Sequence, residues 1–192
     1  TNVATDVFVH DRQTGTTERV SVGPGGVQSD GYTGTCDMSA DGRYVVFSSY
    51  ATNLVADDTN GQSDVFVHDR QTHVTTRASL TNGGEQANNG SAFPAMDASG
   101  RYVVFQSAAT NLVSGDDNWV QDVFLRDMVA GTTTRVSVTA AGQQGNADSQ
   151  WPAISGDGRF VAFVSQTTNF GGGPNGQAQV YRKDRGTGSL IM

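Results

Sequence analysis

The chain has 192 residues, of which 16% are charged, and its formal net charge is −7. This acidic balance excludes the basic face on which nucleic-acid binding depends, and the length is enough for one domain with a hydrophobic core. Cys36 is the only cysteine, which excludes an internal disulfide framework and a cysteine-rich zinc site. We expect Cys36 to be a small buried residue.

The sequence contains no apolar run that approaches the roughly 18 residues of a membrane helix, so we expect no membrane span. Residues 1–6 lead directly into a strand pattern, so we expect no signal peptide at the start of this sequence. We expect either a mature product or a piece of a longer repeat array. The composition is typical of an exported bacterial protein, extracellular or periplasmic.

One segment is repeated along the whole chain. Asp6–Thr14 recurs without change as Asp64–Thr72, and weaker copies start at Asp122 and Gln179. The offset is 58 residues and falls by one in the last copy. Self-similarity at a fixed period indicates a repeat architecture. We divide the single segment 1–192 into units of approximately 6–63, 64–121 and 122–178, with a partial fourth unit at 179–192.

Each full unit contains four strand patterns. The chain opens on a first copy of strand C, which is Val65–Asp69 in the next unit, and continues with strand D, Arg19–Val22. A long loop leads to a short strand A, such as Ala95–Asp97. The turn Ala40–Gly42 then joins strand A to strand B, Arg43–Ser49. An Asp-Gly turn between apolar runs is a strong hairpin signal.

The side chains of strand B are apolar on both faces. Tyr44 and Val46 point to one face and Val45 and Phe47 to the other, because side chains alternate along a strand. Such a strand must be covered on both sides, whereas strand D alternates apolar with polar residues. Four-stranded antiparallel sheets stacked around an axis give this pattern, so we predict an all-β fold, a β-propeller. A parallel β-helix is the alternative, although its rungs are shorter and lack Asp-Gly hairpins.

Two motifs resemble the TolB-like propeller repeat of bacteria. They are the turn Ser39–Arg43 before an apolar strand that ends in Phe47, and the strand Asp64–Asp69, which in other copies precedes a Thr-Gly turn. The resemblance covers essentially the whole chain and implies four-stranded blades. It implies little about function, since such propellers serve many roles. The chain departs from the pattern at His73, where glycine is absent, and at Cys36, where other copies have proline.

The predicted strands amount to about three and a half blades. Closed propellers need at least about four blades, and an open arc leaves apolar sheet faces bare at both ends. We therefore expect the ring to be completed by further blades outside this chain or by homo-oligomerisation.

The long B–C and D–A loops are predicted to emerge on one face of the ring and the tight A–B and C–D turns on the other. Binding sites favour long loops on a rigid scaffold, so we expect any ligand on the B–C/D–A face. Two B–C loops share the spacing Asp-x-Asn-x-x-x-Asp, and their oxygen ligands predict calcium. The candidate calcium ligands are Asp58, Asn60, Asp64, Asp116, Asn118 and Asp122. The alternative is that these residues only shape turns. The third loop, 173–179, has lost both carboxylates and is predicted not to bind metal.

Two tryptophans, Trp119 and Trp151, each occur in one copy only. They are the weaker ligand candidates, able to stack on a sugar or a partner, and the alternative is local packing. His10 and His68 share one strand C position that holds Arg or Lys in later copies, so we predict a solvated position. The recurrent Gln28, Gln86 and Gln144 are predicted to make structural hydrogen bonds.

No catalytic motif is present: the sequence has no nucleophile elbow, no His-Glu-x-x-His and no phosphate loop. We therefore predict a non-catalytic, exported propeller segment that binds a protein or a glycan, or acts as a scaffold, with calcium as the candidate cofactor. The alternatives are the propeller domain of a larger secreted hydrolase or peptidase, and a sugar-binding propeller.

Overall fold

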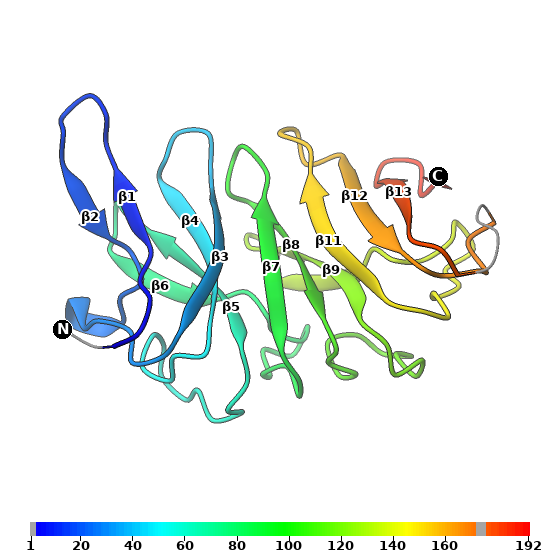
Figure 1. Ribbon diagram of the computed structural model, residues 1–192, viewed down its shortest axis with the longest axis horizontal. Helices are drawn as coiled ribbons and strands as arrows, with labels where there is room; N and C mark the ends of the chain where they lie inside the picture. Colours follow the sequence, from blue (N-terminus) through cyan, green and yellow to red (C-terminus); the bar gives the residue numbers. More distant parts are fainter. Residues whose placement is uncertain (1–2, 172–175) are drawn as a thin grey trace.

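The computed structural model describes residues 3–171 and 176–192, which form antiparallel sheets joined by turns and loops (Figure 1). A two-stranded hairpin precedes three four-stranded sheets, and strand order within each sheet follows the chain. The hairpin is β1 (Phe8–His10) and β2 (Thr17–Arg19). The second sheet is β3 (Thr33–Met38), β4 (Tyr44–Ser49), β5 (Asp64–Asp69) and β6 (Val74–Arg77). The third sheet is β7 (Ser91–Met96), β8 (Tyr102–Ser107), β9 (Asp122–Asp127) and β10 (Thr132–Arg135). The fourth sheet is β11 (Ser149–Ile154), β12 (Phe160–Ser165), β13 (Gln179–Asp184) and β14 (Leu190–Ile191).

This arrangement confirms the all-β prediction of about three and a half blades with strands A to D in each full sheet. The sheets do not close into a ring, as Figure 1 shows. The short helical turn η1 (Pro24–Gly26) is the one helix in the described part of the chain. The described residues contain no helix that is long and apolar enough to span a membrane.

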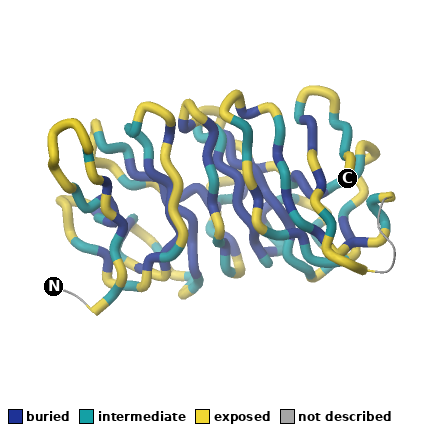
Figure 2. Tube along the Cα trace, turned by 45° about the horizontal axis from the view of Figure 1, so that its top comes forward, coloured by how far each residue is buried: buried dark blue, intermediate teal, exposed yellow. Residues whose placement is uncertain are grey.

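The middle strands are buried on both faces, as their composition requires. Phe47 and Phe66 are opposite each other in the pairing of β4 with β5, and both side chains are fully buried. Neighbouring sheets contribute to shared apolar clusters; one of them joins Val46 and Val67 of the second sheet to Phe105 and Phe124 of the third. Figure 2 shows the buried residues along the sheets and the exposed ones mainly at the loops and turns. The core is therefore a series of sheet-to-sheet layers.

Backbone hydrogen bonds also join consecutive sheets. In the A–B turns, the amide of Ala40 donates to the carbonyl of Ala98, and the amide of Ala98 donates to that of Gly156, both at 3.0 Å. Near the long loops, the amide of Ser91 donates to the carbonyl of Ser63 at 2.7 Å. The strands β3, β7 and β11 lie next to one another along one side of the arc (Figure 1). These strands form the inner surface of the arc.

The inner strands are longer than predicted and are interrupted by bulges. The register of β7 shifts between Ala92 and Ala95, and that of β11 shifts between Gln150 and Ala153. Phe93 and Trp151 lie in these bulges with φ of +52° and +51°. This left-handed conformation is unfavourable for aromatic residues and costs on the order of 1–3 kcal/mol at each position. Each of the two strained residues precedes a proline, which cannot supply a ladder hydrogen bond.

Two expectations for local structure were wrong. Strand D in the first copy spans Thr17–Arg19, whereas the prediction placed it at 19–22. The amide of Val20 still donates to the carbonyl of Val7, and Val22 makes only an isolated bridge to Gln28. Cys36 is exposed. It lies on β3 at the inner surface, where no further layer covers it.

Candidate functional site

The residues predicted to bind calcium in the first such loop surround an arginine. Asp58 Oδ2 lies 3.0 Å from Arg77 Nη2, and Asp64 Oδ2 lies 3.5 Å from Arg77 Nε. Asp64 also accepts hydrogen bonds from Ser79 Oγ at 2.5 Å and from Asn60 Nδ2 at 2.9 Å. The three charged side chains are almost completely buried. Burial raises the pKa of Asp58 and Asp64, and the positive charge of Arg77 opposes that rise.

The second loop repeats the arrangement 58 residues later. Asp116 and Asp122 lie 3.3 Å and 3.2 Å from Arg135 Nη1, and Asn118 Nδ2 donates to Asp122 at 3.1 Å. Burial raises the pKa of Asp116 to about 6, against the lowering effect of Arg135. The first copy has the pair Asp6 and Arg19 at 3.4 Å. The structure therefore brings the predicted ligands together in both loops.

As arranged, these residues do not fit a calcium ion. The guanidinium group already occupies the position of positive charge between the two carboxylates. Asn60 directs its amide nitrogen to Asp64 and uses its oxygen to accept from the Gln62 amide. Calcium needs six or more oxygen ligands turned toward it. The third loop, predicted not to bind metal, lies partly outside the described residues. Calcium binding at these loops stays a prediction.

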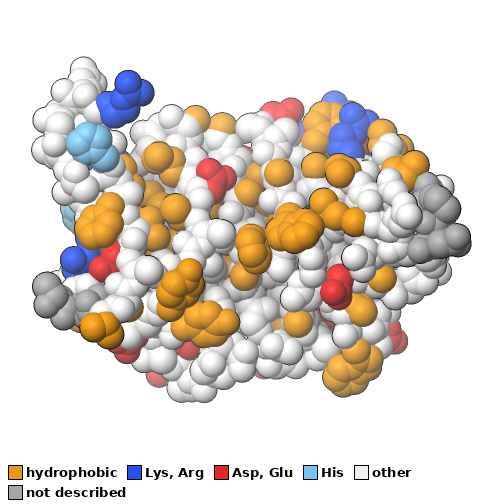
Figure 3. All heavy atoms as spheres, in the orientation of Figure 1, with side chains coloured by type: hydrophobic (Ala, Val, Ile, Leu, Met, Phe, Trp, Pro, Cys, Tyr) orange, Lys and Arg blue, Asp and Glu red, His pale blue; other side chains and the backbone are white. Residues whose placement is uncertain are grey.

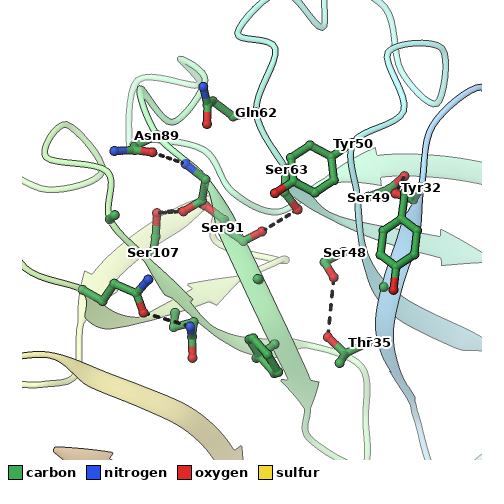
Figure 4. Close-up of a pocket in the computed structure, with 17 residues that line it drawn as sticks. Tyr32, Thr35, Ser48, Ser49, Tyr50, Gln62, Ser63, Asn89, Ser91 and Ser107 are labelled. Atoms are coloured by element: carbon green, nitrogen blue, oxygen red, sulfur yellow. Dashed lines mark hydrogen bonds between the residues drawn. The ribbon is translucent and has the colours of Figure 1, made fainter.

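A groove lies between the second and third sheets, on the face of the arc where the B–C and D–A loops emerge. Its volume is about 590 Å³. Tyr32 and Tyr50 line it from the second sheet, and Asn89, Ser91 and Ser107 line it from the third (Figure 4). The amide of Tyr50 donates to the carbonyl of Tyr32 at 2.9 Å, which sets the two tyrosines next to each other. Both are more than half exposed.

The polar residues of the groove are held by hydrogen bonds to one another. Ser63 Oγ donates to the carbonyl of Ser91 at 3.0 Å, and Ser91 shares a hydroxyl hydrogen bond with Ser107. Gln106 Nε2 donates to Gln121 Oε1 at 2.9 Å. No residue that lines the groove, among those described, carries a charge. The site can therefore offer hydroxyl, amide and aromatic contacts but no ion pair.

The two candidate tryptophans lie apart from each other in the chain but are both exposed. Trp151 is 56% exposed, and its backbone amide donates to Gln106 Oε1, a groove residue, at 2.9 Å. Trp119 is 84% exposed, in the B–C loop two residues before Gln121. Figure 3 shows hydrophobic side chains distributed over the surface that β3, β7 and β11 present. Trp151 thus borders the groove, whereas Trp119 is not among its lining residues.

Sequence reasoning missed Tyr32, Tyr50 and Phe93, which all line the groove. Phe93 is aligned with Trp151 in the repeat, and this alignment was the one available signal. The two tyrosines belong to separate segments that meet only where β3 pairs with β4. No spacing in the sequence indicates that contact.

The prediction of a solvated position for His68 was wrong. His68 is fully buried and its counterparts Arg126 and Lys183 are largely buried, whereas His10 is exposed. Arg126 and Lys183 are accommodated because each donates to backbone carbonyls of the preceding sheet, those of Thr81 and Val138 for example. A buried cation with such partners looks the same in sequence as a solvated one.

The recurrent glutamines make hydrogen bonds that connect loops, as predicted. Gln28 Nε2 donates to Asp6 at 2.8 Å, and Gln86 Nε2 donates to the carbonyl of Asp57 at 2.8 Å and to Thr59 at 2.9 Å. Gln144 contacts Arg135 and Asp117. These glutamines join each D–A loop to the neighbouring acidic clusters.

Solved propeller structures are similar to this chain. A prolyl endopeptidase structure matches with a TM-score of 0.57 and 15% identity, over 95% of this chain and 25% of that one. The tricorn protease matches with a TM-score of 0.57 and 12% identity, over 97% and 20%. The β-propeller domain of the Trilobed protease from Pyrococcus furiosus matches with a TM-score of 0.52 and 10% identity, over 84% and 41%. The fold is a β-propeller.

Structures named TolB are also among the similar chains. TolB from Acinetobacter baumannii has a TM-score of 0.44 and 12% identity, over 96% of this chain and 47% of that one. The chain spans less than half the length of each of the four proteins named here. No family model matches the sequence. No curated protein matches it either.

Proposed function

We propose that the chain is a non-catalytic binding segment of an exported propeller, and that it holds a neutral glycan in the groove between the second and third sheets. The observation that carries the proposal is the lining of the groove, which combines exposed aromatic rings with amides and hydroxyls and lacks charge. Aromatic side chains supply flat apolar surface, and the polar groups fix orientation. An uncharged, hydroxyl-rich ligand fits this combination.

Strain at the groove adds support. Phe93 lines the groove and Trp151 borders it, and both adopt the unfavourable left-handed conformation in the bulges of their strands. Backbone outliers of this kind cluster at ligand sites. This strain supports a ligand site on the B–C/D–A face that the loop lengths predict.

An array of neutral and acidic glycans tests the proposal, followed by calorimetry on any hit. We expect neutral glycans to bind and Tyr50→Ala to weaken binding by about fivefold or more, since a stacked aromatic contributes on the order of 1 kcal/mol or more. Val129→Ala is the matched control, because Val129 is exposed and lies in a C–D turn away from the groove. An array without hits, or equal weakening by both variants, would contradict the proposal.

A second candidate is the propeller domain of a larger secreted peptidase. It is favoured by the proteases among the similar structures, which share the fold with this chain. Likeness at this level of identity supports the fold alone. The sequence of the complete gene distinguishes the candidates, since a hydrolase domain beside the array would favour the peptidase.

For the acidic loops, we propose that Arg77 and Arg135 supply the positive charge that the sequence assigned to calcium. The supporting observation is the set of buried ion pairs around each guanidinium. Thermal melts with a chelator and with added calcium chloride test this account. We expect the same melting temperature in both, and a rise with calcium would favour the calcium hypothesis instead, because a ligand of the native state must stabilise it.

Closure of the ring is a further part of the proposal. The first and last sheets of the arc leave apolar residues exposed, such as Phe8, Val180 and Ile191. Additional blades or further copies of the chain would cover them. Mass measurement in solution separates the two, since a multiple of the chain mass indicates copies and a single mass indicates missing blades.

A further inference from the structure

Three side chains with metal-binding chemistry meet on the face of the tight turns, opposite the proposed ligand face. They are Glu18 of β2, His68 of β5 and His73 of the turn after β5, and their ligand atoms all lie within 4.8 Å of one another. We propose that these residues bind one divalent transition-metal ion of the zinc class. Two imidazoles and a carboxylate are a donor set that zinc uses in proteins, with a fourth position left for water.

His68 carries the strongest sign of a missing partner. Its side chain is fully buried, and Nε2 has no hydrogen-bond partner. An unpartnered buried nitrogen costs free energy, so such a group needs an explanation.

The tautomer of His68 follows from its neighbour Thr75. Thr75 Oγ1 lies 2.6 Å from the carbonyl oxygen of Val22, to which only the hydroxyl hydrogen can be donated. That hydroxyl must therefore accept at its other contact, 2.9 Å from His68 Nδ1. Nδ1 carries the hydrogen, and Nε2 presents a lone pair. Fixing one ring nitrogen with a hydrogen bond so that the other can ligate is typical of metal-binding histidines.

His73 occupies a position that otherwise holds glycine. Its φ is +57°, and the equivalent residues Gly15, Gly131 and Gly188 have φ between +67° and +74°. A side chain at such a position is strained relative to glycine. The ring centroid of His73 lies 6.5 Å from that of His68, and His73 Nδ1 lies 3.7 Å from Glu18 Oε1.

Glu18 is held with one oxygen still available. Arg70 Nε donates to Oε2 at 2.9 Å, and Oε1 faces His73. The side chain of His73 is 72% exposed, so rotation of that ring can bring the ligand atoms to the distances of about 2.0–2.2 Å that zinc requires. A bound ion would join β2 of the hairpin to β5 of the next sheet.

The other repeats act as internal controls. The residues equivalent to Glu18 are Thr76 and Thr134, and those equivalent to His68 in the later units are Arg126 and Lys183. The three ligand types coincide at one junction between sheets. The set is therefore not a by-product of the repeat.

Calorimetry with zinc chloride tests the proposal, in a Cys36→Ser background because that thiol is exposed. We expect one ion per chain and a higher melting temperature with zinc. His73→Gly restores the glycine of the other copies and should fold normally, yet weaken zinc binding by about tenfold or more. Glu18→Gln and His68→Gln should do the same, whereas His10→Gln, which changes the exposed equivalent of His68, should leave binding unchanged.

Cobalt chloride gives an independent readout, since a tetrahedral site with nitrogen and oxygen ligands produces visible absorption that an octahedral aqueous ion lacks. We expect this absorption in the wild type and its loss in His73→Gly. Absence of zinc binding in the wild type would overturn the proposal, and so would binding of equal strength in His73→Gly.

Discussion

Replacement of Arg77 with alanine is expected to destabilise the fold strongly. The side chains of Arg77, Asp58 and Asp64 are 5%, 3% and 0% exposed, and both carboxylates face the guanidinium. Removing one partner of a buried ion pair leaves uncompensated charge and costs about 3–5 kcal/mol. We expect the free energy of unfolding of Arg77→Ala to fall by that amount near neutral pH.

Arg101→Ala is the matched control. Arg101 also pairs with a carboxylate, Asp127, at 2.7 Å, but its side chain is 45% exposed. The buried Asp127 carboxylate keeps hydrogen bonds from the amides of Val129 and Ala130, and Arg101 itself reaches solvent, so this variant should lose less stability than Arg77→Ala. The comparison isolates burial, because both variants remove an arginine from an ion pair.

The penalty for Arg77→Ala should depend on pH in a definite direction. Burial raises the pKa of Asp58 and Asp64, and Arg77 lowers it again. Without Arg77 both pKa values rise further above those of the unfolded chain, so the folded variant takes up protons first. The loss of stability is then largest at neutral pH and shrinks as the pH falls through the raised pKa values.

Urea unfolding followed by circular dichroism, at about pH 7 and about pH 5, measures both effects. A loss near that of Arg101→Ala would refute the reasoning. A loss from Arg77→Ala that is the same at both pH values would refute the pH argument.

Three further predictions concern single residues. Phe105→Ala should lower the free energy of unfolding by about 3–5 kcal/mol in urea, because the ring is fully buried and stacks on Phe124 at 6.0 Å. In metal-free buffer, His73→Gly should raise it by about 1 kcal/mol, since glycine relieves the left-handed strain. The pKa of Asp116 is raised to about 6 in the folded protein, so the folded state holds this proton more tightly than the unfolded chain does. The stability that this proton contributes is present at acidic pH and is lost as the pH rises through about 6. Urea melts across pH should show that decline in the wild type and a smaller one in Asp116→Asn.

The fold was predictable because strand B and strand C carry apolar residues on both faces. Val46 and Val45 point in opposite directions, yet both are buried, each against a different neighbouring sheet. A repeat that shows this pattern several times leaves few architectures open. Strand D was placed wrongly because Val20 and Val22 continue the apolar alternation beyond Arg19, the last residue of β2.

The candidate sites were harder to predict, for a physical reason. The spacing of Asp58, Asn60 and Asp64 is visible in sequence, but the arginine that neutralises them comes from the end of β6. The groove likewise needs two sheets, and Tyr32 and Phe93 come to line it only when those sheets pack. His68 was misjudged because depth in a sheet cannot be read from the residue types that share a position.

The hydrogen bonds between consecutive sheets have a consequence for how such a chain can change its length. Ala40 contacts Ala98 as Ala98 contacts Gly156, so each junction presents nearly the same surface to the next. Joining residue 63 directly to residue 122 would remove one unit and bring equivalent surfaces together. Recombination between identical segments such as Asp6–Thr14 and Asp64–Thr72 would produce a deletion of the same length, or the matching duplication, and would leave each remaining unit whole. The number of blades is therefore a property that genetic exchange can alter in whole steps, while the structure of each blade is retained.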